Sequence, residues 1–272
     1  MNTAHTNTPG AEPAAEIVAD RSGGILRLQL NRPAKKNAMT SNMYATLADL
    51  LDGAAKDDEV RVVVLHGAGD SFTAGNDLGD FLKNPPKPGE SVQVRFVTAL
   101  MNFGKPVVAA VHGVAVGSGT TMLTHCDFVY AAENTRFQLP FINLAVVPEL
   151  GSSYLIPSTA GYLAAAELFL LGVPFNARRA AEIGMVTRVV AEDGVLATAM
   201  ETAGALVEKP FIALQASKRL LKRWSREQTE AAVKVETEEF VVRVRSDEAR
   251  EAMNAFLQKR PPNFTKPKVA TP

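Results

Sequence analysis

The chain has 272 residues, of which 46% are hydrophobic and 21% charged, so it can bury a sizeable core in one large domain or a domain with an appendage. Basic and acidic residues both number 29, and the formal net charge is zero. This balance argues against nucleic acid or an anionic membrane as the main partner, because both favour a basic excess. The single cysteine, Cys126, excludes an intrachain disulfide, and its apolar neighbours indicate a buried structural thiol.

Residues 1–19 are rich in alanine, threonine, proline and glutamate and predict a mobile leader. This segment lacks the basic and apolar regions of a secretory signal. The last residues do not match the Ser-Lys-Leu peroxisomal address, and no apolar run approaches the roughly 20 residues that a membrane span needs. We therefore expect a cytoplasmic protein.

The first regular element is predicted at Ile25–Leu30, where alternating leucines indicate a half-buried strand. Thr40 or Ser41 then caps a predicted helix with one apolar side, and a second helix is predicted at Val92–Phe103. Three apolar runs predict strands buried on both faces: Val60–Leu65, Pro106–Ala115 and Phe128–Ala131.

Strands that alternate with helices predict an α/β fold with right-handed crossovers, which we place at residues 20–206. The pattern changes near Pro210, and residues 207–272 form a predicted helical C-terminal region. Three helical segments are expected there, with no β-like run between them: Ile212–Trp224, Glu227–Val244 and Asp247–Lys259.

Two glycine-bearing turns follow predicted strands. Gly117-Ser118-Gly119 leads into an apolar helical segment, so its backbone N–H groups and the helix dipole suit a developing oxyanion; the alternative is a plain strand-to-helix connection. Ala74-Gly75-Asn76-Asp77 predicts either a second site of N–H donors or a turn in which Asp77 caps a helix.

One carboxylate stands out downstream, in Val147-Pro148-Glu149-Leu150. Its apolar neighbours predict partial desolvation, which raises the pKa of Glu149 toward that of a general base; the alternative is an ordinary solvated loop glutamate. Two N–H-bearing turns and one carboxylate suffice to acidify a carbon next to a thioester and to move its proton. No histidine or carboxylate cluster suggests a metal, and His125 is expected to be a core residue.

Several short motifs, taken in order, resemble the crotonase (enoyl-CoA hydratase/isomerase) superfamily. The likeness covers roughly residues 23 to 264 and is specific through the order of its parts, which include Leu30-Asn31-Arg32-Pro33, Phe72–Leu78, Lys105–Gly113, Ala115–Gly119, Cys126-Asp127 and Gly184-Met185-Val186. The resemblance implies a spiral of ββα units that associates as homotrimers or hexamers. It also implies that the C-terminal helices complete the pocket and the subunit contacts.

The resemblance also assigns roles to residues. The oxyanion-hole N–H groups fall on Asn76 and Ser118, whereas the two glutamates of family hydratases fall on Thr121 and Phe141, which are not acidic. The stretch from Pro148 to Ser153 is similar to the peroxisomal type of 3,2-trans-enoyl-CoA isomerase, in which the glutamate is the single base, and this implies Glu149 as the catalytic residue.

The implied substrate is an acyl-CoA thioester, with no further cofactor and no metal. Residues implied at the substrate and CoA site are Ala74, Gly75, Asp77, Leu78, Gly117 and Phe141, with Lys35 and Lys36 near the CoA phosphates. Two alternatives stay open: another crotonase-type enzyme, such as an atypical hydratase or an isomerase of ring-containing CoA thioesters, and a non-catalytic acyl-CoA-binding protein.

Overall fold

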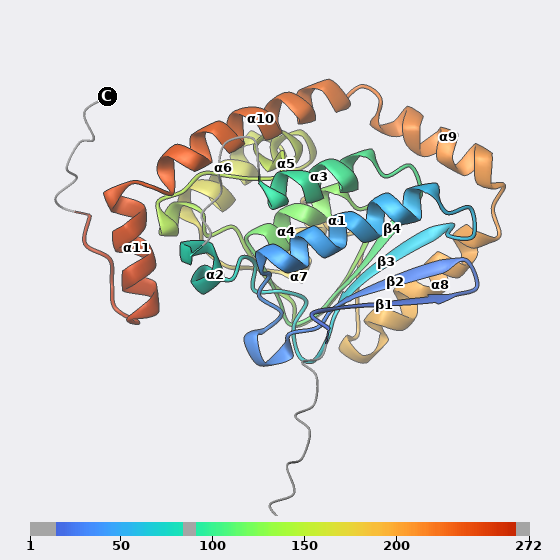
Figure 1. Ribbon diagram of the computed structural model, residues 1–272, viewed down its shortest axis with the longest axis horizontal. Coiled ribbons are helices and arrows are strands. Elements are labelled where there is room, and N and C mark those ends of the chain that lie inside the picture. Colours follow the sequence, from blue (N-terminus) through green and yellow to red (C-terminus); the bar gives the residue numbers. More distant parts are fainter. Residues whose placement is uncertain (1–14, 84–90, 265–272) are drawn as a thin grey trace, which may run out of the picture.

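The computed structural model describes residues 15–83 and 91–264 (Figure 1). Most of the predicted leader lies outside these residues, but its end was placed too late. Residues 17–19 begin strand β1 (Ile17–Ser22), which pairs antiparallel with β2 (Ile25–Leu30). β1 is an edge strand with only its first residue buried, so it lacks the apolar alternation that marks a strand in sequence.

The main sheet has the order β1-β2-β3-β4-β6-β9, and every pairing except that of β1 is parallel. Its remaining strands are β3 (Val62–Gly67), β4 (Val107–Val111), β6 (Phe128–Ala132) and β9 (Arg188–Val190). The strand at 25–30 is confirmed, and those predicted at 60–65 and 128–131 are confirmed within two residues.

The run predicted as one strand at 106–115 is two strands. β4 ends at Val111, and β5 (Val114–Val116) joins a second, three-stranded sheet with β7 (Arg136–Gln138) and β8 (Phe175–Asn176). Gly113 makes the break, because its φ is +63° and a Cβ at this position would lie 1.9 Å from the Asp70 carbonyl oxygen, which excludes a side chain. The apolar pattern conceals this turn because both strands contain buried residues.

Alternate residues of the main sheet bury its two faces. Leu28 and Leu65 pack in the core with helices α1 (Ser41–Lys56) and α3 (Val92–Asn102), while Val64 and Val108 face α8 (Val195–Val207). Figure 1 shows α1 and α3 on one side of the sheet and α8 on the other. The Thr40 side chain accepts a hydrogen bond from the Met43 N–H, which confirms the predicted cap of α1.

Three helices follow α8, within two residues of the predicted ranges: α9 (Phe211–Lys222), α10 (Arg226–Arg243) and α11 (Asp247–Leu257). α10 packs on α5 (Ser152–Ala160) and extends toward α11, which contacts the short helix η3 (Ile142–Leu144) (Figure 1).

The other helical elements are η1 (Pro33–Lys35), α2 (Leu78–Lys83), α4 (Ser118–Thr121), η2 (Met122–His125), α6 (Tyr162–Leu171), α7 (Ala177–Glu182) and η4 (Glu192–Gly194). Within the described ranges, no helix is both long enough and apolar enough to cross a membrane.

Candidate active site

The two predicted turns meet in space. Isolated β-bridges join Met39 to Asn76 and Thr73 to Ala115, so the turn after β3 lies against the start of β5. Gly75, at φ +83°, passes so close to the second turn that a Cβ would lie 2.4 Å from the Val116 carbonyl oxygen. This approach and the positive φ explain why glycine stands at this position.

Two main-chain N–H groups remain without a hydrogen-bond acceptor from the described part of the chain where these turns meet. The N–H groups of Asn76 and Ser118 have no acceptor among the residues that the structure describes. The Ser118 nitrogen lies only 3.7 Å from a Cβ built on Gly75, which places it beside the first turn. Asp77 does cap α2, since its Oδ1 accepts hydrogen bonds from the N–H groups of Gly79 and Asp80 at 3.0 and 3.1 Å. The capping role and the donor arrangement are therefore compatible.

Glu149 lies in the turn between η3 and α5 and is only 9% exposed. Burial raises the pKa of its carboxyl group to about 7; a hydrogen bond with the Asn76 side chain lowers this pKa, and the charge of Glu236 raises it. The Oε1 atom is buried and has no hydrogen-bond partner among the described residues. The predicted desolvation is confirmed, and the solvated-loop alternative is wrong.

Two side chains hold the backbone that follows Glu149. Leu150 adopts a left-handed conformation, with φ at +62°, and the His125 imidazole Nε2 donates to its carbonyl oxygen at 2.7 Å. Burial lowers the pKa of His125 to about 4, so the ring is neutral at pH 7, in agreement with the expected core histidine. The Glu236 carboxylate accepts hydrogen bonds from the N–H groups of Gly151 and Ser153 at 2.6 and 2.7 Å.

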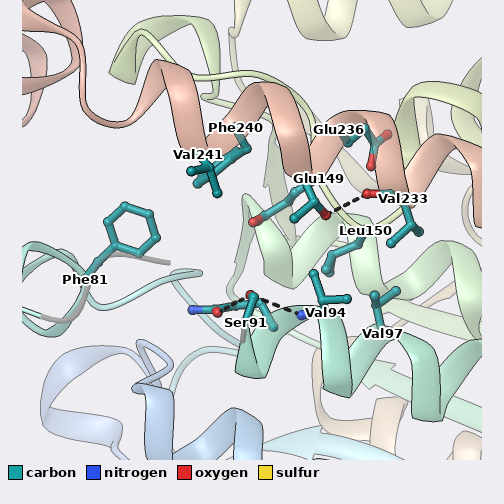
Figure 2. A pocket seen from close by; sticks show the side chains of 12 residues that line it. Phe81, Ser91, Val94, Val97, Glu149, Leu150, Val233, Glu236, Phe240 and Val241 are labelled. Atoms are coloured by element: carbon teal, nitrogen blue, oxygen red, sulfur yellow. Dashed lines mark hydrogen bonds between the residues drawn. The ribbon is translucent and has the colours of Figure 1, made fainter. Parts of the chain in front are cut away.

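Figure 2 shows how these groups are placed. Glu149 and Leu150 lie between α10, which contributes Val233 and Glu236, and α3, which contributes side chains such as Val94. The sequence analysis missed Glu236, because a glutamate in a charged helix carries no sign that tertiary packing buries it.

A cavity of about 990 Å³ opens on the other side of Glu149. Its lining includes most of the predicted substrate and CoA residues: Lys35, Ala74, Gly75, Asn76, Asp77, Leu78, Gly117 and Phe141. Lys36 does not line it; its side chain is exposed, and its carbonyl oxygen accepts from the Ala74 N–H at 2.9 Å. α11 and the residues after it add further lining, including Met253, Phe256 and Arg260.

The two positions that the resemblance assigns to hydratase glutamates hold Phe141 and Thr121, and both side chains are buried. Phe141 is buried, lines the cavity and lies near the Phe169 ring, with 6.2 Å between ring centroids. Thr121 is fully buried, and its hydroxyl donates to the Ser118 carbonyl oxygen at 3.5 Å. The described residues contain no group of three or more histidine, cysteine or acidic side chains that could hold a metal ion.

Tyr44, from α1, is a second residue that the sequence analysis missed. Its hydroxyl lies 2.6 Å from both Asn76 Oδ1 and Ser118 Oγ, so it contacts the residues that carry the two free N–H donors. In the sequence, the tyrosine is one more large residue in a helix with an apolar side, and only the structure shows where its hydroxyl points.

The family model described as enoyl-CoA hydratase/isomerase matches residues 20–267. The chain belongs to this family. It is 36% identical to the 1,2-epoxyphenylacetyl-CoA isomerase of Escherichia coli K12, over 92% of this chain and 98% of that protein. It is 34% identical to the enoyl-CoA delta isomerase 2 of Rattus norvegicus, over 92% of this chain and 66% of that longer protein.

Among solved structures, Pseudomonas aeruginosa OdaA superposes with a TM-score of 0.88 at 42% identity, over 90% of this chain and 99% of that one. The predicted crotonase fold is therefore confirmed. The chain is an enzyme of the enoyl-CoA hydratase/isomerase family, and an acyl-CoA thioester substrate fits that family.

Proposed function

We propose that the enzyme converts 3-enoyl-CoA to trans-2-enoyl-CoA, with Glu149 as the single base. The observation that carries this proposal is the pairing of a buried carboxylate, whose pKa is raised to about 7, with two unpaired N–H groups at Asn76 and Ser118. Both glutamates that the resemblance assigns to family hydratases are absent, because their positions hold Thr121 and Phe141.

In the proposed mechanism the thioester oxygen accepts hydrogen bonds from the N–H groups of Asn76 and Ser118. Glu149 Oε1 removes a proton from C2, and the electron pair of that C–H bond delocalises into the thioester as an enolate. The two N–H groups stabilise the oxyanion, and a single donor of this kind is typically worth about 3 kcal/mol. The enolate electrons then form the C2–C3 double bond, the C3–C4 double bond breaks, and its π electron pair takes the proton from Glu149 as a new C4–H bond, which restores the Glu149 carboxylate.

Phe141 supports isomerisation over hydration. Adding water to a 2-enoyl thioester requires one group to activate water and another to manage the proton at C2. An aromatic side chain at one of these positions excludes water from the cavity wall and supplies neither function.

We also propose, from the resemblance, that the enzyme assembles as a homotrimer or hexamer and that Lys35 lies near the CoA phosphates.

A second candidate is the isomerisation of a ring-containing CoA thioester. The 36% identity to 1,2-epoxyphenylacetyl-CoA isomerase over nearly the whole of both chains favours it. The same donors and the same base would serve this substrate class. Direct comparison of a straight-chain 3-enoyl-CoA with an epoxyphenylacetyl-CoA, as competing substrates, separates the two candidates.

The decisive experiment follows the ultraviolet absorbance of the conjugated 2-enoyl thioester when the purified enzyme meets a 3-enoyl-CoA. We expect turnover by the wild type and a loss of about 10³-fold in kcat for Glu149→Gln. Glu201→Gln, at an exposed position on α8, is the matched control and is expected to keep full activity.

A hydration assay with 2-enoyl-CoA completes the test. Little hydration, together with isomerisation that collapses only in the Glu149 variant, supports the proposal. Wild-type isomerisation that survives Glu149→Gln would move the base elsewhere, and hydration without isomerisation would overturn the proposed function. Acyl-CoA binding without turnover of any thioester would favour a non-catalytic role.

A further inference from the structure

Tyr44 touches the candidate active site without entering its cavity. The side chain is fully buried, it is not part of the cavity lining, and its ring packs on Phe96 with 5.6 Å between centroids. Its hydroxyl reaches Asn76 Oδ1 and Ser118 Oγ, each at 2.6 Å. One hydroxyl group therefore bridges the two turns that present the free N–H donors.

The hydroxyl proton can be assigned by elimination. A tyrosine has one proton to donate, and an amide oxygen can only accept. Tyr44 therefore donates to Asn76 Oδ1, and the Ser118 hydroxyl donates to the Tyr44 oxygen. Burial holds the pKa of Tyr44 well above its usual value, with a further contribution from the Glu149 charge, so the phenol remains a neutral donor near pH 7.

This assignment fixes the orientation of the Asn76 amide. With Oδ1 committed to Tyr44, the NH₂ group is the part of the amide left to meet Glu149, and a hydrogen bond with the Asn76 side chain does lower the pKa of that carboxyl. The second carboxylate oxygen, Oε1, stays free of protein partners within the described ranges. Asn76 and Glu149 line the same cavity, so the Asn76 amide can favour the charged form of the carboxylate while Oε1 stays available for a substrate proton.

We propose that Tyr44 is a positioning residue, which orients the Asn76 amide toward Glu149 and ties the Asn76 turn to the Ser118 turn through one hydroxyl group. This inference rests on the proposed function for its kinetic consequence, but not for its effect on the titration of Glu149. It goes beyond the single-base proposal because one side chain in α1 then influences two properties of the site. These are the pKa of Glu149 and the relative position of the Asn76 and Ser118 N–H groups.

The direction of the effect on Glu149 can be worked out. Without the Tyr44 hydroxyl, the Asn76 amide loses the contact that orients it, and its hydrogen bond to the carboxylate weakens. That bond favours the charged form of Glu149, so its loss raises the pKa, by about one unit for a hydrogen bond of ordinary strength to a charged group. Because Tyr44 is neutral, its replacement removes no charge. The charged group facing Glu149 from α10, Glu236, is unchanged by the substitution.

The test compares Tyr44→Phe with Tyr130→Phe. Tyr130 is also buried, and its hydroxyl bonds Thr202 at 2.7 Å on the α8 side of the sheet, so the control loses an equivalent group far from the site. With 3-enoyl-CoA we expect Tyr44→Phe to lower kcat about 10- to 100-fold, as a small misplacement of reacting groups does, with KM changed less than about threefold. Tyr130→Phe should stay within about twofold of the wild type.

Two further measurements separate positioning from simple loss of structure. The pKa of Glu149 is read from its carboxylic-acid band by difference infrared spectroscopy on the substrate-free enzyme, with Glu149→Gln as the blank. We expect a rise of about one unit in Tyr44→Phe and none in Tyr130→Phe. This readout holds even if the enzyme acts on a different thioester, so a failure of the proposed function leaves the inference testable.

The second measurement is a double-mutant cycle with Asn76→Ala, which keeps the main-chain N–H. If Tyr44 acts through the Asn76 amide, Tyr44→Phe should change the Glu149 pKa by less than about 0.3 units in the Asn76→Ala background. An unchanged pKa in Tyr44→Phe, or an equal shift in both backgrounds, would overturn the inference.

Discussion

Burial of the Glu149 side chain makes its charged carboxylate form less favourable than it would be in water. A buried acid with little compensation keeps its proton to a higher pH, and burial accordingly raises the pKa of Glu149 to about 7. In its proposed role as the base Glu149 must be ionised, so kcat/KM should fall about tenfold per pH unit below pH 7 and level off above it. A pH profile with a 3-enoyl-CoA checks this expectation, and an acid limb near the ordinary glutamate value would contradict it.

The same shift predicts a stability effect. The folded-state pKa lies above the unfolded value, so the folded protein binds the Glu149 proton more tightly between about pH 4.5 and 7, and this stabilisation is lost as pH rises through that window. Glu149→Gln removes the dependence. The unfolding free energy of Glu149→Gln minus that of the wild type should therefore increase by on the order of 1–3 kcal/mol when the pH is raised from 5 to 8.

Urea denaturation at these two pH values, beside the exposed-site control Glu201→Gln, measures the gain. A difference between Glu149→Gln and the wild type that is the same at both pH values would argue against a raised pKa.

At the scale of elements, α10 holds the chain that follows Glu149 through the Glu236 carboxylate. Glu236→Ala would leave the buried N–H groups of Gly151 and Ser153 without their acceptor, at about 1–3 kcal/mol each, so we expect a loss of roughly 2–6 kcal/mol of unfolding free energy. The lost charge also removes one cause of the raised pKa of Glu149, so the acid limb should move to lower pH. Glu238→Ala, exposed on the same helix, serves as the control in denaturation and pH-rate measurements. Equal stability of the two variants would contradict the structural role given to the Glu236 carboxylate.

The close contact between the Gly75 turn and the Val116 carbonyl oxygen gives a second prediction at the scale of elements. Gly75→Ala would place a methyl group 2.4 Å from a carbonyl oxygen at a positive φ, so it should lower stability by more than about 2 kcal/mol and reduce activity. Gly53→Ala, within α1 and with no atom within 4 Å of the new Cβ, should instead stabilise by about 0.5–1 kcal/mol. Thermal unfolding and turnover of both variants provide the comparison, and an active, fully stable Gly75→Ala enzyme would contradict the packing argument.

The sequence predicted those helices and strands whose formation depends on residues that are neighbours in the chain. The alternation in Ile25–Leu30 and the cap at Thr40 depend on neighbours in sequence, and both were found. The break at Gly113 and the partners of Tyr44 and Glu236 depend on contacts between distant segments, which no sequence period records. Glu149 was predicted as a candidate because its desolvating neighbours adjoin it in the chain and because the stretch from Pro148 to Ser153 resembles the isomerases.

On the scale of the whole molecule, the C-terminal helices contribute directly to the site. α10 supplies Glu236, and α11 supplies Met253 and Phe256 to the cavity wall. The function assigned to residues 207–272, completion of the pocket and of subunit contacts, stays a prediction. The exposed apolar surface of the single chain gives a way to test the subunit contacts.

Helix α6 is apolar on nearly every side, yet only Ala165 and Leu168 are fully buried in the single chain. A helix with that composition normally lies inside a core, so we expect its exposed face to be covered in an assembly. Leu163→Lys, at a position 83% exposed, should therefore shift the enzyme from the proposed trimer or hexamer toward monomers. Ile212→Lys, at a similarly exposed position on α9, tests in the same way whether the C-terminal helices make the subunit contacts expected of residues 207–272.

Light scattering coupled to size-exclusion chromatography measures the masses of the wild type and both variants. A monomeric wild type would contradict the expected homotrimer or hexamer, and dissociation by Ile212→Lys alone would place the contact on α9 instead of α6. Leu170 and Leu171 join the α6 surface to the cavity that Glu149 faces, so loss of the assembly through α6 should also raise KM for acyl-CoA. A monomeric Leu163→Lys enzyme with an unchanged KM would separate assembly from substrate binding and confine α6 to a structural role.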